Sequence, residues 1–569
     1  MNEDLAKEIR KLALQNAFEH EGKTQNKIIL AKILGTQPEY RTKVKEIIGD
    51  ISQIVTSVNE LSFEQQKKEI EENFPELLAP KEKIEEREGL PPLSNAEQGK
   101  VVTRFPPEPN GYPHIGHAKA AIINAEYAKM YGGKCILRID DTNPEAERME
   151  YHAAIKVGLD WLGIEFDVVK STSNDMELFY EKGAELINSG KAYVCTCKRE
   201  DISKNRRERK ACKCSFENID KNNKGWGKMF EKYKTGDAIV RFRGDMKADN
   251  AVMRDPVLFR IIEEKHYTLG EKYRVWPSYD FAVAIEDSHD GITHAFRSKE
   301  FELRKELIDS ILDALDMRKP YQGFFSRLEF KGMPISKRIL KPLIEEGKVS
   351  WYDDPRLPTL EALRRRGIKP EAIKKFVLSL GLTKANTLAP FDALEAFNRK
   401  FVDADSIRLF MVSRPKKITI KKLPMSFVEI PNHPIRDIGK RKIEIDENFL
   451  IEENDANNIN EGSQVRLLGL GNIIINKTDP VLEGEFIGEG GITNVPKIQW
   501  VAEKNANQIK LLIPKQLFID EEFNEDSLEE LDVYTEPQYA QLKEGEEIQF
   551  VRFGYCRKDS QNQAIFTHK

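Results

Sequence analysis

The chain has 569 residues, 40% of them hydrophobic, which is enough to bury several separate cores in three to five domains. No run approaches the roughly 18 apolar residues of a membrane span, and the polar start Met1-Asn2-Glu3-Asp4 is unlike a signal peptide, so we expect a cytoplasmic protein. With a formal net charge of only -5, local basic patches must hold any nucleic acid.

The first 95 residues predict a helical bundle. Apolar residues recur at three- and four-residue steps, in one stripe of Leu5, Ile9, Leu12 and Ala13 and in another of Val44, Ile47, Ile48, Ile51, Ile54, Val55 and Val58. The charged stretch 81–92 ends in Gly-Leu-Pro-Pro and predicts a linker. This appendage contains no catalytic motif. It could bind tRNA or an unidentified partner protein, or only stabilise the chain.

The stretch 103–119 reads Thr-Arg-Phe-Pro-Pro-Glu-Pro-Asn-Gly-Tyr-Pro-His-Ile-Gly-His-Ala-Lys. The β-prone run 101–105 predicts a strand, the prolines with Asn110-Gly111 predict a turn, and Ala118 opens a helix. Ligands of a doubly wound sheet bind outside the carboxyl ends of its strands, and a helix N-terminus offers free N–H groups to phosphate. We therefore expect a nucleotide at this loop.

Two histidines mark the start of that helix. His114 and His117 are three residues apart with the small Gly116 between them, so both imidazoles face one side and the backbone can approach a ligand. The pair suits donation to phosphate. A His-x-x-His taken alone could equally cap the helix and contact no ligand.

The segment resembles the long form of the HIGH signature found in the glutamyl/glutaminyl branch of class I aminoacyl-tRNA synthetases. This resemblance implies a Rossmann-type catalytic domain in which one group of residues binds ATP, with the two histidines as catalytic residues. It also implies that Arg104 contacts the amino-acid substrate. The ATP-binding residues that it implies here are Pro107, Glu108, Asn110, Gly111, His114, Gly116 and His117.

A βαβ unit is predicted to follow. Its helix, 117–131, ends at a Gly-Gly pair, and the buried strand that starts at Cys135 runs into Asp140 and Asp141 at its carboxyl end. The two aspartates could simply form a turn. Because a carboxylate in the resembling enzymes helps to hold the amino acid, the resemblance implies that role for Asp140, and Asp141 has no assigned role.

Four of the six cysteines form two Cys-x-Cys pairs, Cys195 with Cys197 and Cys212 with Cys214. Since disulfides are rare in a reducing compartment, two thiolate pairs favour a closed tetrahedral zinc site over four free, partly buried thiols. The loop between the pairs is basic and could lie against a phosphate backbone, like the acceptor-stem-binding insertion of the family that the chain resembles, or it could be a solvated charge run. Its cations are Lys198, Arg199, Lys204, Arg206, Arg207, Arg209 and Lys210.

The resemblance continues through 276–287 and 291–300. It implies that Tyr279 lines the amino-acid pocket, while Val283 replaces a side chain that is often polar in the family. Arg297 matches the arginine by which glutamyl enzymes hold the substrate's side-chain carboxylate, so we expect glutamate and poor binding of glutamine. Alternatively, Arg297 pairs with a protein acid such as Glu300 or Glu302, or points toward tRNA.

The second class I signature, KMSKS, is present in altered form as Met333-Pro334-Ile335-Ser336-Lys337-Arg338. Only Ser336 and Lys337 match fully, and the resemblance implies that both contact ATP. A mobile cation such as Lys337 suits a transition state that places charge on pyrophosphate.

The last third of the chain predicts a basic helical connector that touches the inner side of tRNA, with Arg364-Arg365-Arg366 and Lys369, and then short alternating strands. The segments 431–434, 500–502 and 550–556 resemble the anticodon-binding barrels of glutaminyl-type enzymes, which implies the archaeal and eukaryotic lineage. A glutamate pocket with such barrels could serve tRNA-Gln as well as tRNA-Glu.

The predicted architecture is a multidomain α/β + β chain. It comprises an N-terminal helical domain with a linker (1–95), a Rossmann-type catalytic domain in two halves (96–174 and 276–340), a zinc-binding acceptor-stem insertion (175–275), a helical connector (341–405) and two antiparallel β-barrels (406–569). The expected function is ATP- and Mg²⁺-dependent ligation of glutamate to tRNA-Glu, with positioning and electrostatic stabilisation as the mechanism. A glutaminyl-tRNA synthetase and a non-catalytic tRNA-binding scaffold are the alternatives.

Overall fold

A computed structural model describes residues 3–19, 22–36, 44–74, 89–385, 387–491 and 494–569, which form two compact units, Met1–Glu88 and Gly89–Lys569. Most of the predicted linker, residues 81–88, lies outside the described residues. Over the parts of the chain that are described, no helix is long and apolar enough to cross a membrane.

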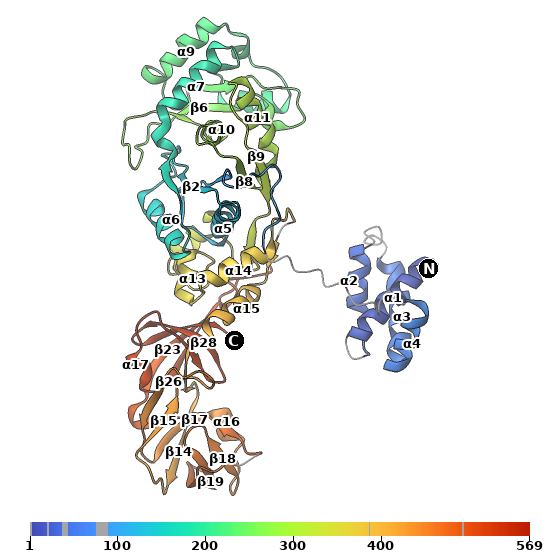
Figure 1. The fold of residues 1–569 in the computed structure, drawn as a ribbon, viewed down its shortest axis with the longest axis vertical. Helices are drawn as coiled ribbons and strands as arrows, with labels where there is room; N and C mark the ends of the chain where they lie inside the picture. The colour runs from blue at the N-terminus through green and yellow to red at the C-terminus, as the bar shows by residue number, and fades with distance from the viewer. Residues whose placement is uncertain (1–2, 20–21, 37–43, 75–88, 386, 492–493) are drawn as a thin grey trace. The chain divides into compact units, whose positions relative to one another are not determined.

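The N-terminal unit is helical, as its apolar periodicity predicts (Figure 1). Its helices are α1 (Glu3–Glu19), α2 (Asn26–Thr36), α3 (Val44–Glu60) and α4 (Phe63–Asn73). Ile9, Ile51 and Ile70 meet in its buried core. Ser62 caps α4 reciprocally with Gln65, and such a box satisfies two N–H groups that a helix start leaves open.

The catalytic part is built on parallel strands. The sheet has the order β1-β2-β3, and Thr293, just before β8, donates its backbone N–H to Val102 of β1 at 2.9 Å, which places β8 on the other side of β1. β8 itself pairs in parallel with β9. The chain therefore continues from β1 to β2 on one side of β1 and later returns to β8 on its other side. The carboxyl end of β1 is then the topological switch point, where ligands of open α/β sheets bind. The strands are β1 (Val102–Phe105), β2 (Lys134–Ile139), β3 (Val168–Ser171), β8 (His294–Ser298) and β9 (Tyr321–Phe325).

Helices α5 (Ile115–Met130), α6 (Met149–Trp161) and α11 (Lys305–Ala314) belong to this part of the molecule (Figure 1). α5 starts two residues before the predicted helix because the histidine at 114 takes the cap position. After α5 the chain turns through Gly133, where a Cβ atom would lie 1.9 Å from the Val101 carbonyl oxygen. A glycine is thus needed for the close approach of the backbone that lets β2 align with β1.

The insertion between β3 and β8 has an antiparallel sheet of order β4-β5-β6-β7. Trp276 and Phe259 lie in its hydrophobic core, which α7 and α10 help to enclose. Its strands are β4 (Ala192–Cys195), β5 (Ile239–Phe242), β6 (Val257–Ile261) and β7 (Val275–Pro277), and its helices are α7 (Met176–Asn188), α8 (Arg199–Arg207), α9 (Ile219–Glu231) and α10 (Tyr279–His289).

The predicted connector is helical, and three of the four cations named in it form ion pairs, whereas Arg364 is exposed. Arg365 pairs with Asp559 at 2.8 Å, Arg366 with Glu395 at 2.8 Å and Lys369 with Glu547 at 2.6 Å. Two of these three cations therefore tie the connector to the C-terminal strands. The helices of this region are α12 (Lys337–Glu345), α13 (Leu360–Arg366), α14 (Pro370–Leu380) and α15 (Phe391–Val402).

The C-terminal part contains two seven-stranded sheets, β12-β27-β28-β29-β23-β26-β13 and β21-β18-β19-β20-β14-β17-β22. The prediction of purely antiparallel strands is wrong at four pairs, β12 with β27, β14 with β20, β18 with β21 and β23 with β29, which are parallel. Local alternation shows that a segment is a strand, but partners far apart in sequence decide its direction.

The strands of these sheets are β12 (Ile407–Leu409), β13 (Met411–Val412), β14 (Pro415–Lys421), β17 (Asn448–Glu452), β18 (Gln464–Leu467), β19 (Gly471–Lys477), β20 (Leu482–Gly488), β21 (Lys497–Ile498), β22 (Val501–Ala502), β23 (Asn507–Pro514), β26 (Leu528–Thr535), β27 (Glu547–Phe550), β28 (Gly554–Ser560) and β29 (Gln563–His568). Trp500 is fully buried in the core of the second sheet and donates its indole N–H to the Leu468 carbonyl oxygen.

Candidate active site

The histidine pair caps the helix that it begins. The Nδ1 atom of His114 accepts the Gly116 backbone N–H at 3.1 Å, and that of His117 accepts the His114 backbone N–H at 3.2 Å. The ring centroids are 4.0 Å apart. Both alternatives weighed from the sequence are therefore compatible, because the rings cap the helix with one nitrogen and leave the other nitrogen for a ligand.

The chemistry of that second nitrogen follows from the hydrogen bonds. Because each Nδ1 accepts a hydrogen, the hydrogen of a neutral ring must lie on Nε2, which becomes a donor. Burial lowers the pKa of His117 to about 4 and, together with His117, lowers the pKa of His114 well below its ordinary value. At neutral pH both rings are uncharged N–H donors, suited to an oxyanion but not to acting as a cationic pair.

Backbone contacts fix the loop before these rings. The Ile115 N–H donates to the Pro358 carbonyl oxygen at 3.0 Å, and the Leu360 N–H donates to Pro113 at 2.9 Å. At Gly116, a Cβ atom would lie 2.9 Å from the His114 ring. A larger residue there would displace the ring, so glycine is required by proximity to the ring.

The loop residues predicted to bind ATP lie together. The Pro107 carbonyl oxygen accepts the Asp140 N–H at 3.0 Å, which joins the loop to the end of β2, and Glu108 is exposed. Asn110 and Gly111 continue the loop toward the second signature. There, Ser336 is the N-cap of α12.

Lys337 reaches this loop from more than two hundred residues away in the sequence. Its Nζ atom donates to the Asn110 carbonyl oxygen at 3.0 Å and lies 4.8 Å from the Tyr151 ring centroid. Partial burial and the nearby Arg148 and Lys341 lower its pKa. The structure therefore brings the two signatures together, as expected, and the exposed ammonium group stands next to the ATP-binding loop.

A buried arginine cluster closes the other side of the switch point. Asp287 accepts hydrogen bonds from Arg104 at 2.9 and 3.2 Å, from Arg138 at 2.9 Å and from Arg297 at 2.6 Å. Although burial opposes the charge, the three guanidinium groups hold the pKa of Asp287 far below its ordinary value. Arg138 also pairs with Asp140, Glu286 and Asp290. Among the described residues Arg104 and Arg297 have no carboxylate partner other than Asp287, so the positive charge that the cluster retains lies on these two arginines.

Arg297 pairs with a protein acid, as one of the alternatives proposed, but the acid is neither Glu300 nor Glu302. Its partners are Asp287 and the Gln322 side-chain oxygen, whereas Glu300 pairs with Arg327 and Glu302 pairs with Lys384. Its Nε–H is nevertheless buried with no hydrogen-bond partner in the described part of the chain. This guanidinium is held rigidly and keeps one donor open.

The remaining predicted pocket residues lie around this cluster. Asp140 accepts from Thr172 at 2.7 Å and from Arg138 at 3.3 Å, and burial raises its pKa. Burial also raises the pKa of Tyr279, while Arg297 and Arg104 act against that rise, which shows that both cations lie near the ring. Val283, the position without the polar side chain, is buried in the hydrophobic core.

The four cysteines converge as their spacing suggests. The Sγ atoms of Cys195 and Cys212 are 3.8 Å apart, those of Cys197 and Cys214 are 3.7 Å apart, and all four lie within 4.8 Å of one another. In a tetrahedral zinc site with Zn–S distances of about 2.3 Å, the sulfurs are separated by roughly 3.8 Å. A hydrogen bond from Cys195, with further help from Tyr193, lowers the pKa of Cys212 below its ordinary value. The donor set therefore fits a four-thiolate zinc site.

Two features of the site were missed in the sequence. Asp287 ends the motif that includes Tyr279, but its three arginine partners come from separate strands, so no local pattern marks it as their counter-ion. The segment 358–360 carries no chemical motif, so only the three-dimensional structure reveals that it fixes the histidine loop.

Known families match nearly all of the chain beyond the helical unit. The family model for the catalytic domain of class I tRNA synthetases (E and Q) matches residues 100–404 of the chain. Two family models for the anti-codon binding domain of the same synthetases match residues 406–488 and 497–559.

Similar curated proteins come from archaea. A glutamate-tRNA ligase of Nitrosopumilus maritimus is 80% identical over 569 residues, which is the full length of both chains. Ligases of the same name from Cenarchaeum symbiosum and Pyrococcus furiosus are 57% and 39% identical, each over 99% of this chain and 100% of the relative. Among solved structures, a glutamate tRNA ligase from Elizabethkingia meningosepticum in complex with its amino acid is 20% identical, with a TM-score of 0.41 over 54% of this chain and 70% of that one.

Proposed function

This chain belongs to the class I tRNA synthetases (E and Q), as a glutamate-tRNA ligase of archaeal type, and we propose that the residues at its switch point carry out that reaction in defined roles. The enzyme activates L-glutamate with ATP and transfers it to tRNA, and Mg²⁺ serves the phosphates of ATP. Since its product is used by ribosomes, we place the reaction in the cytoplasm.

In the activation step, the α-carboxylate of glutamate attacks the α-phosphorus of ATP, and pyrophosphate leaves. The Nε2–H groups of His114 and His117 donate to phosphate oxygens as negative charge develops there. Lys337 neutralises the leaving pyrophosphate from the opposite loop. Mg²⁺ supplies additional charge neutralisation on the phosphates. The protein provides no general base in this scheme, and its contribution is positioning and electrostatic stabilisation.

The single observation that carries the choice of glutamate is the excess of positive charge around Asp287. Arg138 has further acidic partners, but Arg104 and Arg297 have only that one carboxylate between them among the described residues, and Arg297 retains an open buried donor. We assign the open donor to the side-chain carboxylate of glutamate, and we assign Asp140 and Tyr279 to the amino-acid pocket. A neutral glutamine side chain would leave the positive charge of the cluster unbalanced.

The four cysteines are proposed to hold a structural zinc ion in the insertion. Such an ion would be coordinated by all four thiolates in a closed tetrahedral site and would link the two chain segments that carry the cysteine pairs. Helix α8, between the pairs, is then held for contact with tRNA through its arginines, and the C-terminal strands are assigned to the anticodon.

ATP–pyrophosphate exchange in the presence of tRNA-Glu tests the proposal. Exchange should depend on glutamate, and glutamine should support it poorly. Faster exchange with glutamine would overturn the assigned pocket, and no exchange with either amino acid would favour the scaffold alternative. Charging of tRNA-Gln in the same preparation measures whether the glutaminyl-type C-terminal sheets widen the choice of tRNA.

A further inference from the structure

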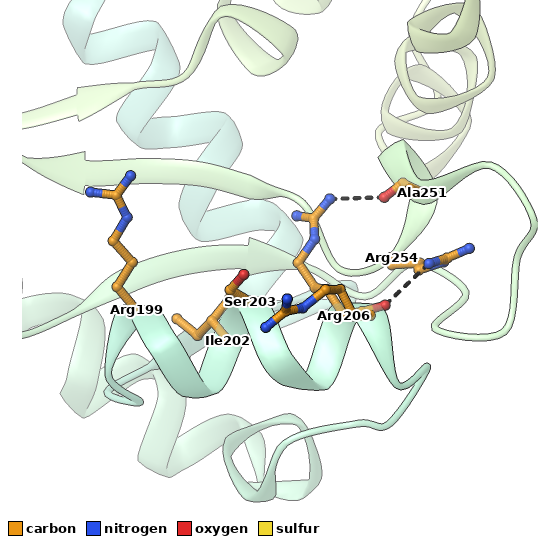
Figure 2. A pocket seen from close by; sticks show the side chains of 7 residues that line it. Arg199, Ile202, Ser203, Arg206, Ala251 and Arg254 are labelled. Carbon is orange, nitrogen blue, oxygen red and sulfur yellow. Dashed lines mark hydrogen bonds between the residues drawn. The ribbon is translucent and has the colours of Figure 1, made fainter.

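A basic pocket lies on the insertion, outside both signature segments. It is a cavity of about 320 Å³ between α8 and the turn that precedes β6 (Figure 2). Its lining residues are Arg199, Ile202, Ser203, Arg206, Arg207, Ala251 and Arg254. Four of the seven are arginines and none is acidic, so the positive charge of the pocket disfavours an apolar ligand or a cation and favours an anion.

The periodicity of α8 produces one wall. Arg199, Ser203 and Arg206 are spaced by four and three residues and therefore share a face of the helix. Arg206 donates to the Ala251 carbonyl oxygen at 2.8 Å, which joins this wall to the opposite one (Figure 2). Ile202 also lines the pocket.

Arg254 makes the opposite wall rigid. All three of its nitrogen positions donate to backbone carbonyl oxygens, at Ala248 (2.8 Å), Arg206 (3.2 Å) and Asp249 (3.1 Å). Carbonyl groups orient a guanidinium without removing its charge. Burial, together with Arg241 and Arg254, lowers the pKa of Arg206, as expected in a positive environment.

The positive charge of the pocket is not balanced from within. In the region that the structure describes, no carboxylate oxygen lies within 4.0 Å of a nitrogen atom of Arg199, Arg206, Arg207 or Arg254. By contrast, Arg209 and Lys210 on the same loop pair with Asp249 and Glu208. The pocket arginines therefore differ from Arg209 and Lys210 in having no acidic partner among the described residues; Arg206 and Arg254 are partly buried, and Arg199 and Arg207 are exposed. Guanidinium groups bind phosphate through paired N–H donors.

The cysteine cluster ties both walls together. Cys197 lies just before α8 and Cys212 just after its following turn, so the two close sulfur pairs bracket the helix. On the other wall, Asp255 follows Arg254 and accepts the Tyr193 hydroxyl at 2.7 Å, and that hydroxyl is 3.7 Å from the Cys212 sulfur. The cluster therefore positions the pocket.

We infer that this pocket binds one phosphate group of the tRNA backbone, through the guanidinium groups of Arg199, Arg206 and Arg207. The inference rests on the proposed function, since it assumes that the insertion meets tRNA. Free inorganic phosphate or pyrophosphate would present the same chemistry, but a pocket open to solvent beside a basic helix suits a phosphate that belongs to a polymer and is held by neighbouring contacts as well.

The test compares two charge-matched variants of the full chain. The pocket variant is Arg199→Gln/Arg207→Gln, whose side chains have no described partner and whose loss should leave folding and zinc content unchanged. The control is Arg209→Gln/Lys210→Gln, which removes the same charge from the same loop outside the pocket. The dissociation constant of tRNA-Glu is measured for each as a function of salt, with the thermal unfolding temperature and metal content as checks.

The pocket variant should bind tRNA-Glu about fivefold more weakly near 0.15 M salt, and the salt dependence should fall by about 0.7 to 0.9 in log–log slope, the value for one lost phosphate contact. The control should keep the wild-type slope, and the charging rate at saturating tRNA should be the same in all three proteins. Equal losses in both variants, or a wild-type slope in the pocket variant, would overturn the inference.

Two further outcomes distinguish tRNA from a free anion as the ligand, and failure of the proposed function from failure of the pocket assignment. If phosphate or pyrophosphate raises the unfolding temperature of the wild type and the control but not of the pocket variant, while both variants bind tRNA like the wild type, the pocket takes a free anion and the tRNA assignment is wrong. If the wild-type chain fails to charge tRNA with glutamate, the proposed function fails first. Normal charging with an unaffected pocket variant rejects only the pocket.

Discussion

The Nζ atom of Lys337 donates a hydrogen bond to the carbonyl oxygen of Asn110 at 3.0 Å. This contact links the start of α12 to the loop before the histidine pair, across 227 positions of sequence. The acceptor is a neutral backbone oxygen, so no acidic group among the described residues neutralises the positive charge of the ammonium group beside the nucleotide site. Exchange of this weak partner for a leaving pyrophosphate would strengthen binding chiefly in the transition state.

Replacing Lys337 by Ala should therefore slow glutamate activation by about 10²- to 10³-fold, with ATP binding less affected. The measurement is the rate of adenylate formation as a function of ATP concentration, with tRNA present. Lys341→Ala is the matched control, because Lys341 lies one turn further along α12 and pairs with Glu345 at 3.5 Å. A loss of equal size in ATP affinity and in rate would contradict a role in the transition state.

His117→Ala should cause a similar fall in activation rate, by removing the Nε2–H donor. The wild-type rate should show no ionisation of this ring near pH 6.5, because its pKa is about 4. Between pH 4 and 6.5 the unfolded chain binds the extra proton, so the stability from the neutral ring is complete above pH 6.5 and decreases as the pH falls toward 4. Rates from pH 5 to 8 and unfolding free energies from pH 4 to 7 check this. An inflection near 6.5 that disappears in the variant would contradict it.

The sequence predicted the residues of this site better than their partners. His114, His117 and the two cysteine pairs are close in sequence, so their spacing alone places them together. Asp287 escaped notice because its three arginine partners come from separate strands, and nothing local marks a shared counter-ion. Similarly, Arg365 and Lys369 looked free because their acidic partners, Asp559 and Glu547, lie far along the chain. Strand periodicity gave the C-terminal strands but not their direction.

The purified protein should contain about one zinc ion per chain, and Cys212→Ser should lower this content and loosen the segment 193–214. Elemental analysis and hydrogen exchange of that segment are the measurements. Cys556→Ser is the control, since Cys556 is equally buried but lies outside the cluster. The loss of zinc should weaken tRNA use more than ATP use. Protein purified without chelators and found free of metal would reject the site.

Asp287→Asn should destabilise the chain by about 3–5 kcal/mol, because it leaves buried arginines without their shared carboxylate. Asp249→Asn, whose partner Arg209 is at the surface, should cost no more than about 1 kcal/mol. The pKa of Asp287 is lowered on folding, so its contribution is complete above the ordinary value of 3.8 and is lost as the pH falls below that value. Denaturant unfolding of the three proteins measures the difference, and equal stabilities would show that the arginines do not depend on Asp287.

Arg297 is expected to decide between glutamate and glutamine. It is buried and held by Asp287 and Gln322, and its Nε–H has no hydrogen-bond partner among the described residues. A substrate carboxylate would both fill that donor and reduce the excess positive charge of the cluster. A side-chain amide has a partial charge only, so it can accept the hydrogen bond without balancing the charge.

Changing Arg297 to Gln should therefore reduce the preference for glutamate by about 2 kcal/mol or more, which is at least about 30-fold in the ratio of kcat/KM for glutamate to kcat/KM for glutamine. The kcat/KM for glutamine should fall far less than that for glutamate, because the neutral side chain of glutamine forms no ion pair with Arg297. Arg297→Lys keeps the charge but cannot serve Asp287, Gln322 and the substrate at once, so it should retain part of the preference with a higher KM for glutamate. Exchange kinetics with both amino acids, at saturating tRNA-Glu, give the ratios. If the ratio in Arg297→Gln equals that of the wild type, the pocket selects glutamate through another group, and Arg297 serves only to orient Asp287.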